Sequence, residues 1–270
     1  MMHRVSLVCL ALAGLFGAAQ APAQDLAYSA DISIDVMPFV AADDDIVGDA
    51  AGTPGAIELG GLPAAVDVIA YHVADGKPFF VVDAATELPG GLLIDGRDVV
   101  LYDGGSYEVH FDGSEKGLPA GVEIDALTME GEALIFSLDV DAEIDGLLVA
   151  DEDLVLFDGD YGLLFDGSGL GVPPAYDVDA VSFTEDGQDL VVSFDTGGEV
   201  AAVEFYDQDG ILWQGAAAFD LYFKGSSIDS SLEAGDLDAL MLGGKPVDQG
   251  LLFKDGFEVG GFGAWSSASP

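Results

Sequence analysis

One short phrase of strand-favouring residues is written twice in this chain, 54 residues apart. The first copy, YEVHFDGSE, begins at Tyr107, and the second copy, YGLLFDGSG, begins at Tyr161. Each phrase reaches an Asp-Gly pair, which is typical of a turn after a strand, because glycine takes positive φ and aspartate tolerates it. A fold assigned to this chain therefore has to explain why a structural unit is repeated.

The repeated unit extends to four strand-like runs, and matching points lie 54 to 58 residues apart. Each run is rich in Val, Leu, Ile and Phe, and Gly, Asp and Pro separate the runs, which predicts antiparallel strands joined by tight turns. The run that opens each unit reads EIDAL in one copy and DVDAV in the next, and we expect it to be the innermost strand. The other matched runs are ALIFSLD from Ala133 with DLVVSFD from Asp189, and DEDLVLFDG from Asp151 with GRDVVLYDGG from Gly96.

Four strands per unit and about four units predict an all-β fold, a β-propeller of four-stranded blades closed by both ends of the chain. The expected repeats cover residues 61–116, 117–170 and 171–234, and segments 235–265 and 28–60 share the last blade. In that blade the run GLLFKD, Gly250 to Asp255, is expected as the second strand. Five blades or a two-layer β-sandwich are the alternatives, and the sandwich does not explain the repetition.

The first 23 residues are typical of a secretory signal peptide, with His3 and Arg4, an apolar run from Val5 to Ala19, and small residues at Ala21 and Ala23. Residues 24–270 are then expected to form a single domain that is exported to the periplasm or outside the cell. The single cysteine, Cys9, lies inside the predicted signal, so the mature chain has neither a disulfide nor a cysteine metal ligand.

The charge of the chain is strongly acidic, with 50 Asp and Glu against 7 Lys and Arg. This balance argues against nucleic acid, whose recognition depends on Lys and Arg contacts to phosphates, and no later run is apolar enough to insert into a membrane. Since half of the residues are hydrophobic, the chain is expected to fold rather than stay disordered. Self-repulsion favours a monomer that is neutralised by divalent cations or by a salty medium. An extracellular protein or a glycan is the expected kind of partner.

The opening run of each unit carries acids two residues apart, which point the same way on a strand. If these runs line the propeller axis, carboxylates from several blades converge there. Ca²⁺ accepts six to eight oxygen ligands in a forgiving geometry, so the sequence predicts an axial calcium site. The alternative is that the acids accept hydrogen bonds from backbone amides and fix the blades. The candidate ligands are Asp67, Glu123, Asp125, Asp177, Asp179, Asp236 and Asp238.

A second group of acids precedes the third strand of each unit and offers a second choice of metal ligands. None of these segments matches the twelve-residue calcium loop with its final Glu, and solvated turn acids are the alternative interpretation. The group consists of Asp43, Asp45, Asp98, Asp151, Asp153, Asp207 and Asp209.

No catalytic set and no cofactor-binding motif is recognisable in the sequence. Outside the predicted signal there are two histidines, His72 and His110, at different strand positions, too few for a zinc site. Neither a G-x-S-x-G motif nor a phosphate-binding glycine loop with lysine is present. These absences favour a non-enzymatic protein.

The DxDA runs and FDG phrases resemble repeats of uncharacterised secreted bacterial proteins, and more distantly the calcium-dependent phytase-like and lactonase-like propellers. The resemblance covers most of the mature chain. The first likeness implies no activity, and the second implies a calcium-dependent hydrolase. For such a hydrolase we expect Asp179 or Asp238 as ligands of an axial metal and an acid from a loop as base. The function favoured by the residues is a secreted binding or scaffold module stabilised by Ca²⁺. The alternatives are that hydrolase and a salt-adapted exoprotein without a specific ligand.

Overall fold

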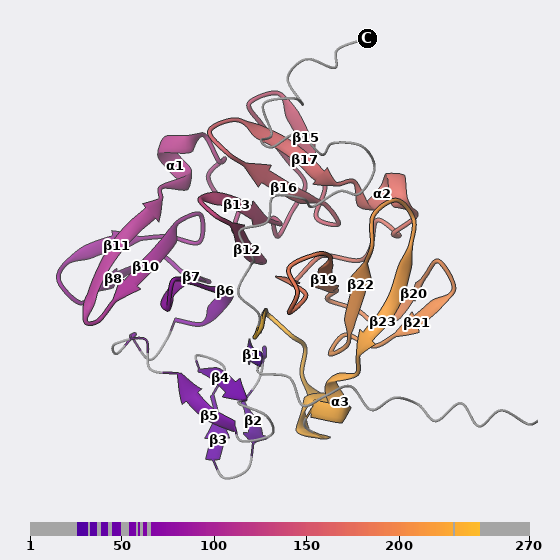
Figure 1. The fold of residues 1–270 in the computed structure, drawn as a ribbon. Coiled ribbons are helices and arrows are strands. Elements are labelled where there is room, and N and C mark those ends of the chain that lie inside the picture. The colour runs from indigo at the N-terminus through magenta and orange to yellow at the C-terminus, as the bar shows by residue number, and fades with distance from the viewer. Residues whose placement is uncertain are drawn as a thin grey trace, which may run out of the picture.

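The computed structural model describes residues 26–243 apart from positions 32, 37–38, 43–44, 50–53, 58, 60–61, 64–65 and 229. Four antiparallel four-stranded sheets surround a common centre (Figure 1). The first sheet contains β6 (Val68–Ala74), β7 (Lys77–Val82), β10 (Val99–Asp103) and β11 (Ser106–Phe111). The second contains β12 (Leu127–Glu130), β13 (Ala133–Phe136), β16 (Leu154–Phe157) and β17 (Tyr161–Phe165). The third contains β18 (Ala180–Phe183), β19 (Leu190–Ser193), β22 (Gly210–Trp213) and β23 (Phe219–Phe223).

The fourth sheet, here called the closing sheet, joins both ends of the described chain. It contains β24 (Ala239–Leu242), β1 (Leu26–Ser29), β4 (Ile46–Asp49) and β5 (Pro54–Ile57). Strand β24 pairs antiparallel with β1, with Leu26 opposite Leu242 and Ser29 opposite Ala239. The second strand of this sheet is therefore N-terminal, and the predicted strand from Gly250 to Asp255 lies outside the described residues.

The innermost strands β6, β12, β18 and β24 contact one another in a closed ring. Four separate apolar cores fill the spaces between neighbouring sheets, and each core draws its side chains from both sheets that flank it. In the core between the first and second sheets, Phe111 lies 6.0 Å from Phe136, measured between ring centroids. This arrangement confirms a four-bladed β-propeller closed by both chain ends, and excludes five blades and the two-layer sandwich.

A small two-stranded hairpin follows the second strand of every sheet. The hairpins are β2 (Ile34–Val36) with β3 (Phe39–Ala41), β8 (Thr86–Leu88) with β9 (Leu92–Ile94), β14 (Ala142–Ile144) with β15 (Leu147–Val149), and β20 (Gly198–Val200) with β21 (Val203–Phe205). Three sheets end in a single helical turn, which is α1 (Gly113–Lys116), α2 (Gly167–Leu170) or α3 (Gly225–Ile228), and the 3₁₀ turn η1 (Ser230–Ala234) follows α3.

The FDG phrase ends a strand and starts a helical turn, rather than forming the hairpin turn that its Asp-Gly pair predicts. Phe111 is buried, Asp112 caps the helical turn by accepting from the Glu115 amide at 2.9 Å, and Gly113 is packed against the backbone. A Cβ atom at Gly113 would lie 2.3 Å from the carbonyl oxygen of Arg97, so the position requires glycine. By contrast, Asp103-Gly104 does form the predicted turn between β10 and β11.

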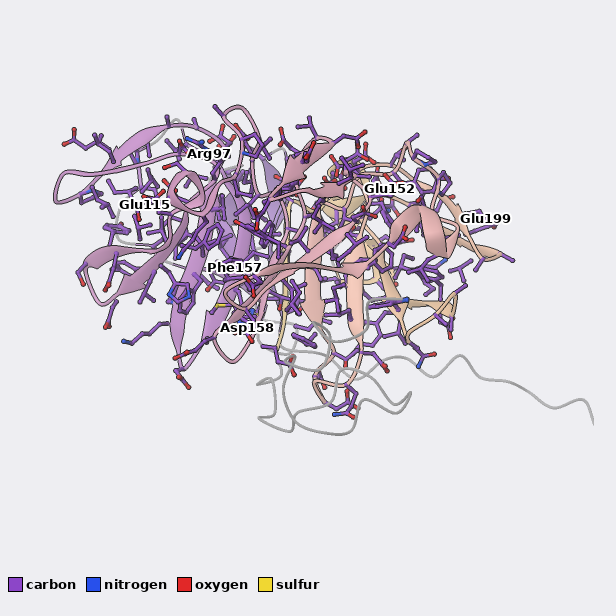
Figure 2. The ribbon with its side chains drawn as sticks, turned by 90° about the horizontal axis from the view of Figure 1, so that it is seen from above. Arg97, Glu115, Glu152, Phe157, Asp158 and Glu199 are labelled. Carbon is purple, nitrogen blue, oxygen red and sulfur yellow. The ribbon has the colours of Figure 1, made fainter. Side chains whose placement is uncertain are left out.

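The starts of the innermost strands, the small hairpins and the ends of the fourth strands share one face of the propeller, because the strands of each sheet alternate in direction. We call it the loop face. Figure 2, which is turned by 90° from the view of Figure 1, shows Arg97, Glu152 and Glu199 towards this face and Asp158 towards the opposite one.

Candidate functional site: an acidic cluster at the mouth of the axis

The acids predicted on the innermost strands lie just before those strands, in extended segments on the loop face. Strand β12 begins at Leu127 and β18 at Ala180, so Glu123, Asp125 and Asp177 all precede their strand. The strands start later than the EIDAL and DVDAV runs predict, although the carbonyls of Glu123 and Asp177 still accept backbone amide protons from Asp139 and Asp195, at 3.2 and 3.1 Å. The alternation survives nevertheless, since Ile124 is fully buried between two half-buried acids.

In each sheet, the side chain of one aspartate binds the backbone of the first acid of the run. This aspartate follows the second strand of the sheet and accepts the amide proton of the first acid. The four hydrogen bonds are Asp67 N to Asp83 Oδ1 at 2.9 Å, Glu123 N to Asp139 Oδ1 at 2.6 Å, Asp177 N to Asp195 Oδ1 at 3.0 Å and Asp236 N to Asp31 Oδ1 at 2.8 Å. The fold thus places the start of every innermost strand at the same height around the axis.

Three of the predicted ligands converge at this height. Carboxylate oxygens of Asp125, Asp177 and Asp179 all lie within 4.8 Å of one another, and they come from the second and third sheets. The Asp179 carboxyl also forms a hydrogen bond with Asp236, which precedes β24 of the closing sheet. We call these four residues the axial cluster. Asp67, Glu123 and Asp238 are not part of the group of three, and in the first sheet Ile69 takes the place of its second acid.

Two oxygens of the axial cluster have no hydrogen-bond donor. Ser137 Oγ lies within hydrogen-bond distance of both Asp125 Oδ1, at 2.5 Å, and the Val178 carbonyl oxygen, at 2.7 Å. Asp125 Oδ2 and Asp177 Oδ1 are buried without a partner. Neither of the ion pairs found among the described residues, Lys77 with Asp103 and Arg97 with Asp95, includes a member of the cluster. Buried carboxylate oxygens without donors are costly, so this arrangement calls for a proton or a cation.

Burial is the main reason why the axial carboxyl groups hold their protons tightly. Burial, together with the charges of Asp236 and Asp125, raises the pKa of Asp179 to about 11. Burial and neighbouring carboxylates raise the pKa of Asp177 to about 7, and burial likewise raises the pKa of Asp236 to about 7. The pKa of Asp125 rises well above its usual range through burial and the charge of Asp177. A divalent cation would compete with these protons for the same oxygens.

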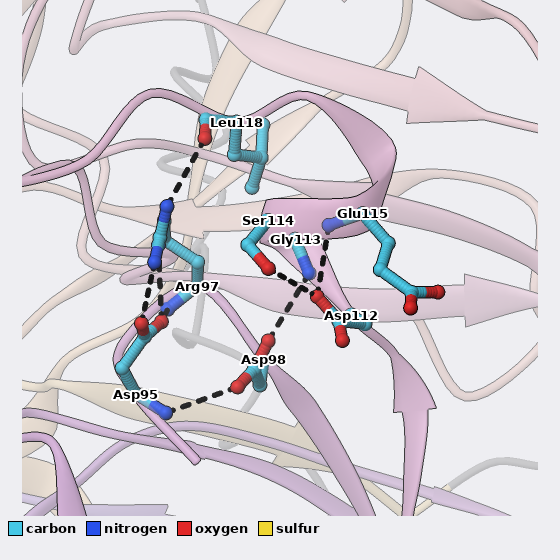
Figure 3. Close-up of polar contacts among 8 residues, drawn as sticks. All are labelled: Asp95, Arg97, Asp98, Asp112, Gly113, Ser114, Glu115 and Leu118. Carbon is cyan, nitrogen blue, oxygen red and sulfur yellow. Dashed lines mark hydrogen bonds and ion pairs between the residues drawn. The ribbon is translucent and has the colours of Figure 1, made fainter.

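The second-choice acids have a different role, which Figure 3 illustrates for Asp98 in the first sheet. Each of three buried aspartates accepts two backbone amide protons, one from the residue three positions earlier and one from the glycine that starts the helical turn. The glycine distances are 3.1 Å for Asp98 with Gly113, 2.8 Å for Asp153 with Gly167 and 3.0 Å for Asp209 with Gly225. These acids tie the third strand to the end of the fourth. They are buried rather than solvated turn acids, and we call them the anchoring aspartates.

The remaining second-choice acids are less uniform. Asp45 accepts from the Ala42 amide at 3.0 Å, as the anchoring aspartates do from the residue three positions earlier. Asp207 accepts from the Gln208 amide at 3.0 Å, and Asp43 lies outside the described residues.

Asp151 belongs to a second acidic group that the sequence analysis did not single out. Carboxylate oxygens of Asp141, Asp151 and Glu152 lie within 4.8 Å of one another on the loop face. Glu152 is only 2% exposed, and burial raises its pKa to about 7. The Asp151-Glu152-Asp153 run was visible in the sequence, but nothing local showed that the hairpin β14–β15 brings Asp141 beside it.

A buried histidine on β6 was also missed as a notable position. His72 is 1% exposed, and its Nδ1 lies 3.3 Å from Thr128 Oγ1 on β12. Its Nε2 has no partner. Burial lowers the pKa of His72 to about 4, so the ring is neutral at physiological pH. His72 therefore joins two innermost strands as an uncharged contact.

Comparisons with known proteins found structural likenesses but no matching sequence. No protein-family model matches the chain, and no curated protein matches it either. A structure of a nidogen/laminin complex is similar with a TM-score of 0.36 and 10% identity, over 82% of this chain and 98% of that chain. The extracellular domain of the putative one-component system BT4673 from B. thetaiotaomicron is similar with a TM-score of 0.34 and 7% identity, over 75% of this chain and 35% of that chain.

At these scores neither likeness carries information about function. This chain spans about a third of the BT4673 chain that it matches. The resemblance to secreted bacterial repeat proteins and to phytase-like propellers stays a prediction. Within the described residues, no helix has the length and apolarity to cross a membrane.

Proposed function

We propose that this protein is an exported, non-enzymatic binding or scaffold module whose propeller is stabilised by a divalent cation at the axial cluster. The observation that carries the proposal is the convergence of Asp125, Asp177 and Asp179, with two buried oxygens that lack any donor. A hard cation with oxygen ligands suits such a set, and Ca²⁺ tolerates its irregular geometry better than Mg²⁺ does. The ion would replace protons that the folded protein otherwise has to retain.

The position of the cluster explains how a bound ion would stabilise the whole fold. The ligands come from the second and third sheets, and Asp236 adds the closing sheet through its hydrogen bond to Asp179. An ion there would link blades that otherwise meet only through apolar cores and a few hydrogen bonds. Binding to the folded state alone adds about 2.7 kcal/mol of stability at a ligand concentration one hundred times Kd.

Thermal unfolding in EDTA and then in excess CaCl₂ tests this proposal, with Asp179→Asn as the decisive variant. Asparagine resembles the protonated carboxyl that the folded protein holds at pH 7.5, so we expect the variant to unfold near the wild-type temperature in EDTA. It should lose most of the calcium-dependent rise in Tm, because one anionic ligand is missing. Asp220→Asn, which changes an exposed acid on β23, is the matched control and should keep the rise.

Two results would contradict the proposal. One is a wild-type Tm that responds equally to NaCl of the same ionic strength, which would favour a salt-adapted protein without a specific ion. The other is a calcium-dependent rise that Asp179→Asn retains in full, which would place the ion elsewhere. Hydrolysis of a lactone or ester panel that Asp179→Asn abolishes would replace the non-enzymatic role with the hydrolase alternative.

A further inference from the structure

The small hairpins expose a large apolar side chain at the same position in three of the four sheets. This residue is the middle one of the second hairpin strand, and an acid lies directly opposite it. The exposed fractions are 65% for Val40, opposite Asp35, 73% for Leu93, opposite Glu87, and 75% for Leu148, opposite Glu143. Single exposed apolar residues are ordinary on protein surfaces, but these three recur at one structural position, each with an acid opposite it.

The hairpin of the second sheet adds a hollow to this pattern. A depression of about 560 Å³ lies between β14–β15 and β17 with α2. Leu148, Leu163 and Ala142 provide its apolar lining, and Asp141, Glu143 and Asp166 are the exposed acids that line it as well. The shape and chemistry suit a long aliphatic side chain with a positive end, because such a chain packs its methylene groups on apolar surface and keeps its charge at the polar edge.

The first and second sheets differ in charge beside this hairpin. The carbonyl oxygens of Arg97 and Glu152 face Gly113 and Gly167 in the same way, so the two residues hold equivalent positions. The Arg97 guanidinium donates to Asp95 Oδ2 at 2.6 Å and to the Leu118 carbonyl at 3.3 Å (Figure 3). In the second sheet Glu152 stands in its place, and Asp141 and Asp151 crowd around it. The first sheet supplies its own positive charge at this site, whereas the second sheet concentrates negative charge.

We propose that the hollow beside β14–β15 is a docking site for a basic segment of a partner protein, in which an arginine or lysine lies beside an apolar residue. The aliphatic stem would lie along Leu148 and Leu163, and the positive group would reach Asp141 and Glu143. A second copy of this chain fits less well, because a net charge of −43 makes the two copies repel each other. This inference rests on the proposed function as a binding module and specifies the chemistry of its partner. It does not depend on the axial cation.

Fluorescence anisotropy with a labelled peptide of alternating leucine and arginine, four of each, tests the docking site on the full chain. We expect binding that weakens about tenfold in Leu148→Ser and in Asp141→Asn, which are typical losses for an anchor residue and for a close charge partner. Leu93→Ser is the matched control, because Leu93 is equally exposed but lies in the sheet that contains Arg97. It should bind the peptide like the wild type, and thermal melts should show that all three variants are folded.

Four results of the peptide assay would overturn the docking site. The first two are no binding of the peptide and equal losses of affinity in Leu93→Ser and Leu148→Ser. The other two are undiminished binding of a peptide with serine in place of leucine, and displacement of the peptide by millimolar CaCl₂ that Asp141→Asn abolishes. The last result would assign the acids to an ion. A dimer in sedimentation that Leu148→Ser dissolves would assign the surface to a second copy and would equally contradict the proposal. The axial cation is tested separately by the calcium melt of Asp179→Asn, so either proposal can fail without the other.

Discussion

The axial cluster and the anchoring aspartates are built from the same residue type, lie on the same face and recur around the same propeller, yet their chemistry is opposite. Both carboxylate oxygens of Asp153 accept backbone amide protons, at 2.9 Å from Ala150 and 2.8 Å from Gly167. In the axial cluster, Asp125 Oδ2 and Asp177 Oδ1 accept none. The difference teaches that the supply of backbone donors, rather than the density of acids, separates a structural carboxylate from a candidate ligand.

The largest expected effect comes from removing an anchoring aspartate. Asp209 is 2% exposed and accepts from the Tyr206 and Gly225 amides at 3.1 and 3.0 Å. Asp209→Ala leaves both amides without this acceptor, the Gly225 amide in a buried position, so we expect a loss of about 2–4 kcal/mol in the free energy of unfolding. Denaturant unfolding in EDTA and in CaCl₂ should show the same loss. A loss that calcium restores would mean that Asp209 is a ligand after all.

A smaller effect on the free energy of unfolding is expected at His72, whose Nε2 is buried without a partner. This residue tests whether an unpaired polar atom near the axis matters when it does not belong to an acid. Its folded pKa, about 4, lies below the unfolded value, so the neutral ring contributes stability that is complete above pH 6.5 and is lost as the pH falls towards 4. His72→Met introduces the residue that Met241 provides at the matching position of β24.

At pH 5 the free energy of unfolding of the Met variant should exceed that of the wild type by about 2 kcal/mol. At pH 7.5 this gap between the two proteins should narrow to about 1 kcal/mol or less. Denaturant titrations at the two pH values measure this change. A gap that is constant with pH would show that the histidine does not titrate as a buried group.

The smallest expected effect gives the sharpest contrast between the axial cluster and the anchoring aspartates. It is the sign of the change in stability that an Asp→Asn substitution causes in each. The pKa of Asp177 is raised to about 7 in the folded protein. Its carboxylate therefore destabilises the folded state fully above that pH. The destabilisation declines as the pH falls towards the pKa of an aspartate in the unfolded chain, near 4. In EDTA at pH 8.5, Asp177→Asn should therefore stabilise the protein by about 1 kcal/mol, and at pH 5.5 it should have little effect.

The same exchange at Asp209 should destabilise the protein at both pH values, because the new amide nitrogen cannot accept a backbone proton. Urea unfolding of both variants in EDTA makes the comparison. Equal signs for the two variants would remove the distinction between the regions.

The repeat made much of this fold predictable, because a unit of four strand-like runs that recurs about four times leaves few architectures. The FDG phrases were also informative, but their Asp-Gly pairs predicted hairpin turns. Asp112 instead caps a helical turn, since Gly113 is pressed against the carbonyl of Arg97, in the turn before β10. Such close approaches between segments far apart in the chain leave no local pattern in the sequence.

The candidate site was only partly predictable, and the reason is geometric. The DxD spacing correctly indicated that carboxylates converge, as Asp125, Asp177 and Asp179 do. The same reasoning did not reveal that Asp98 and Asp209 are buried structural acids, because one of the two donors to each is a glycine amide that follows the fourth strand. Likewise, Glu152 was visible in an acidic run, but its burial depends on the packing of α2 against it.

The most direct test of the axial cluster is a crystal structure of the protein grown with CaCl₂, with the ion identified by its anomalous scattering. We expect one calcium ion with oxygens of Asp125, Asp177 and Asp179 at about 2.3–2.6 Å. Axial carboxyl groups that hydrogen bond to one another at full calcium concentration, with no ion between them, would show that protons alone hold the cluster together and would contradict the proposed role of the cation.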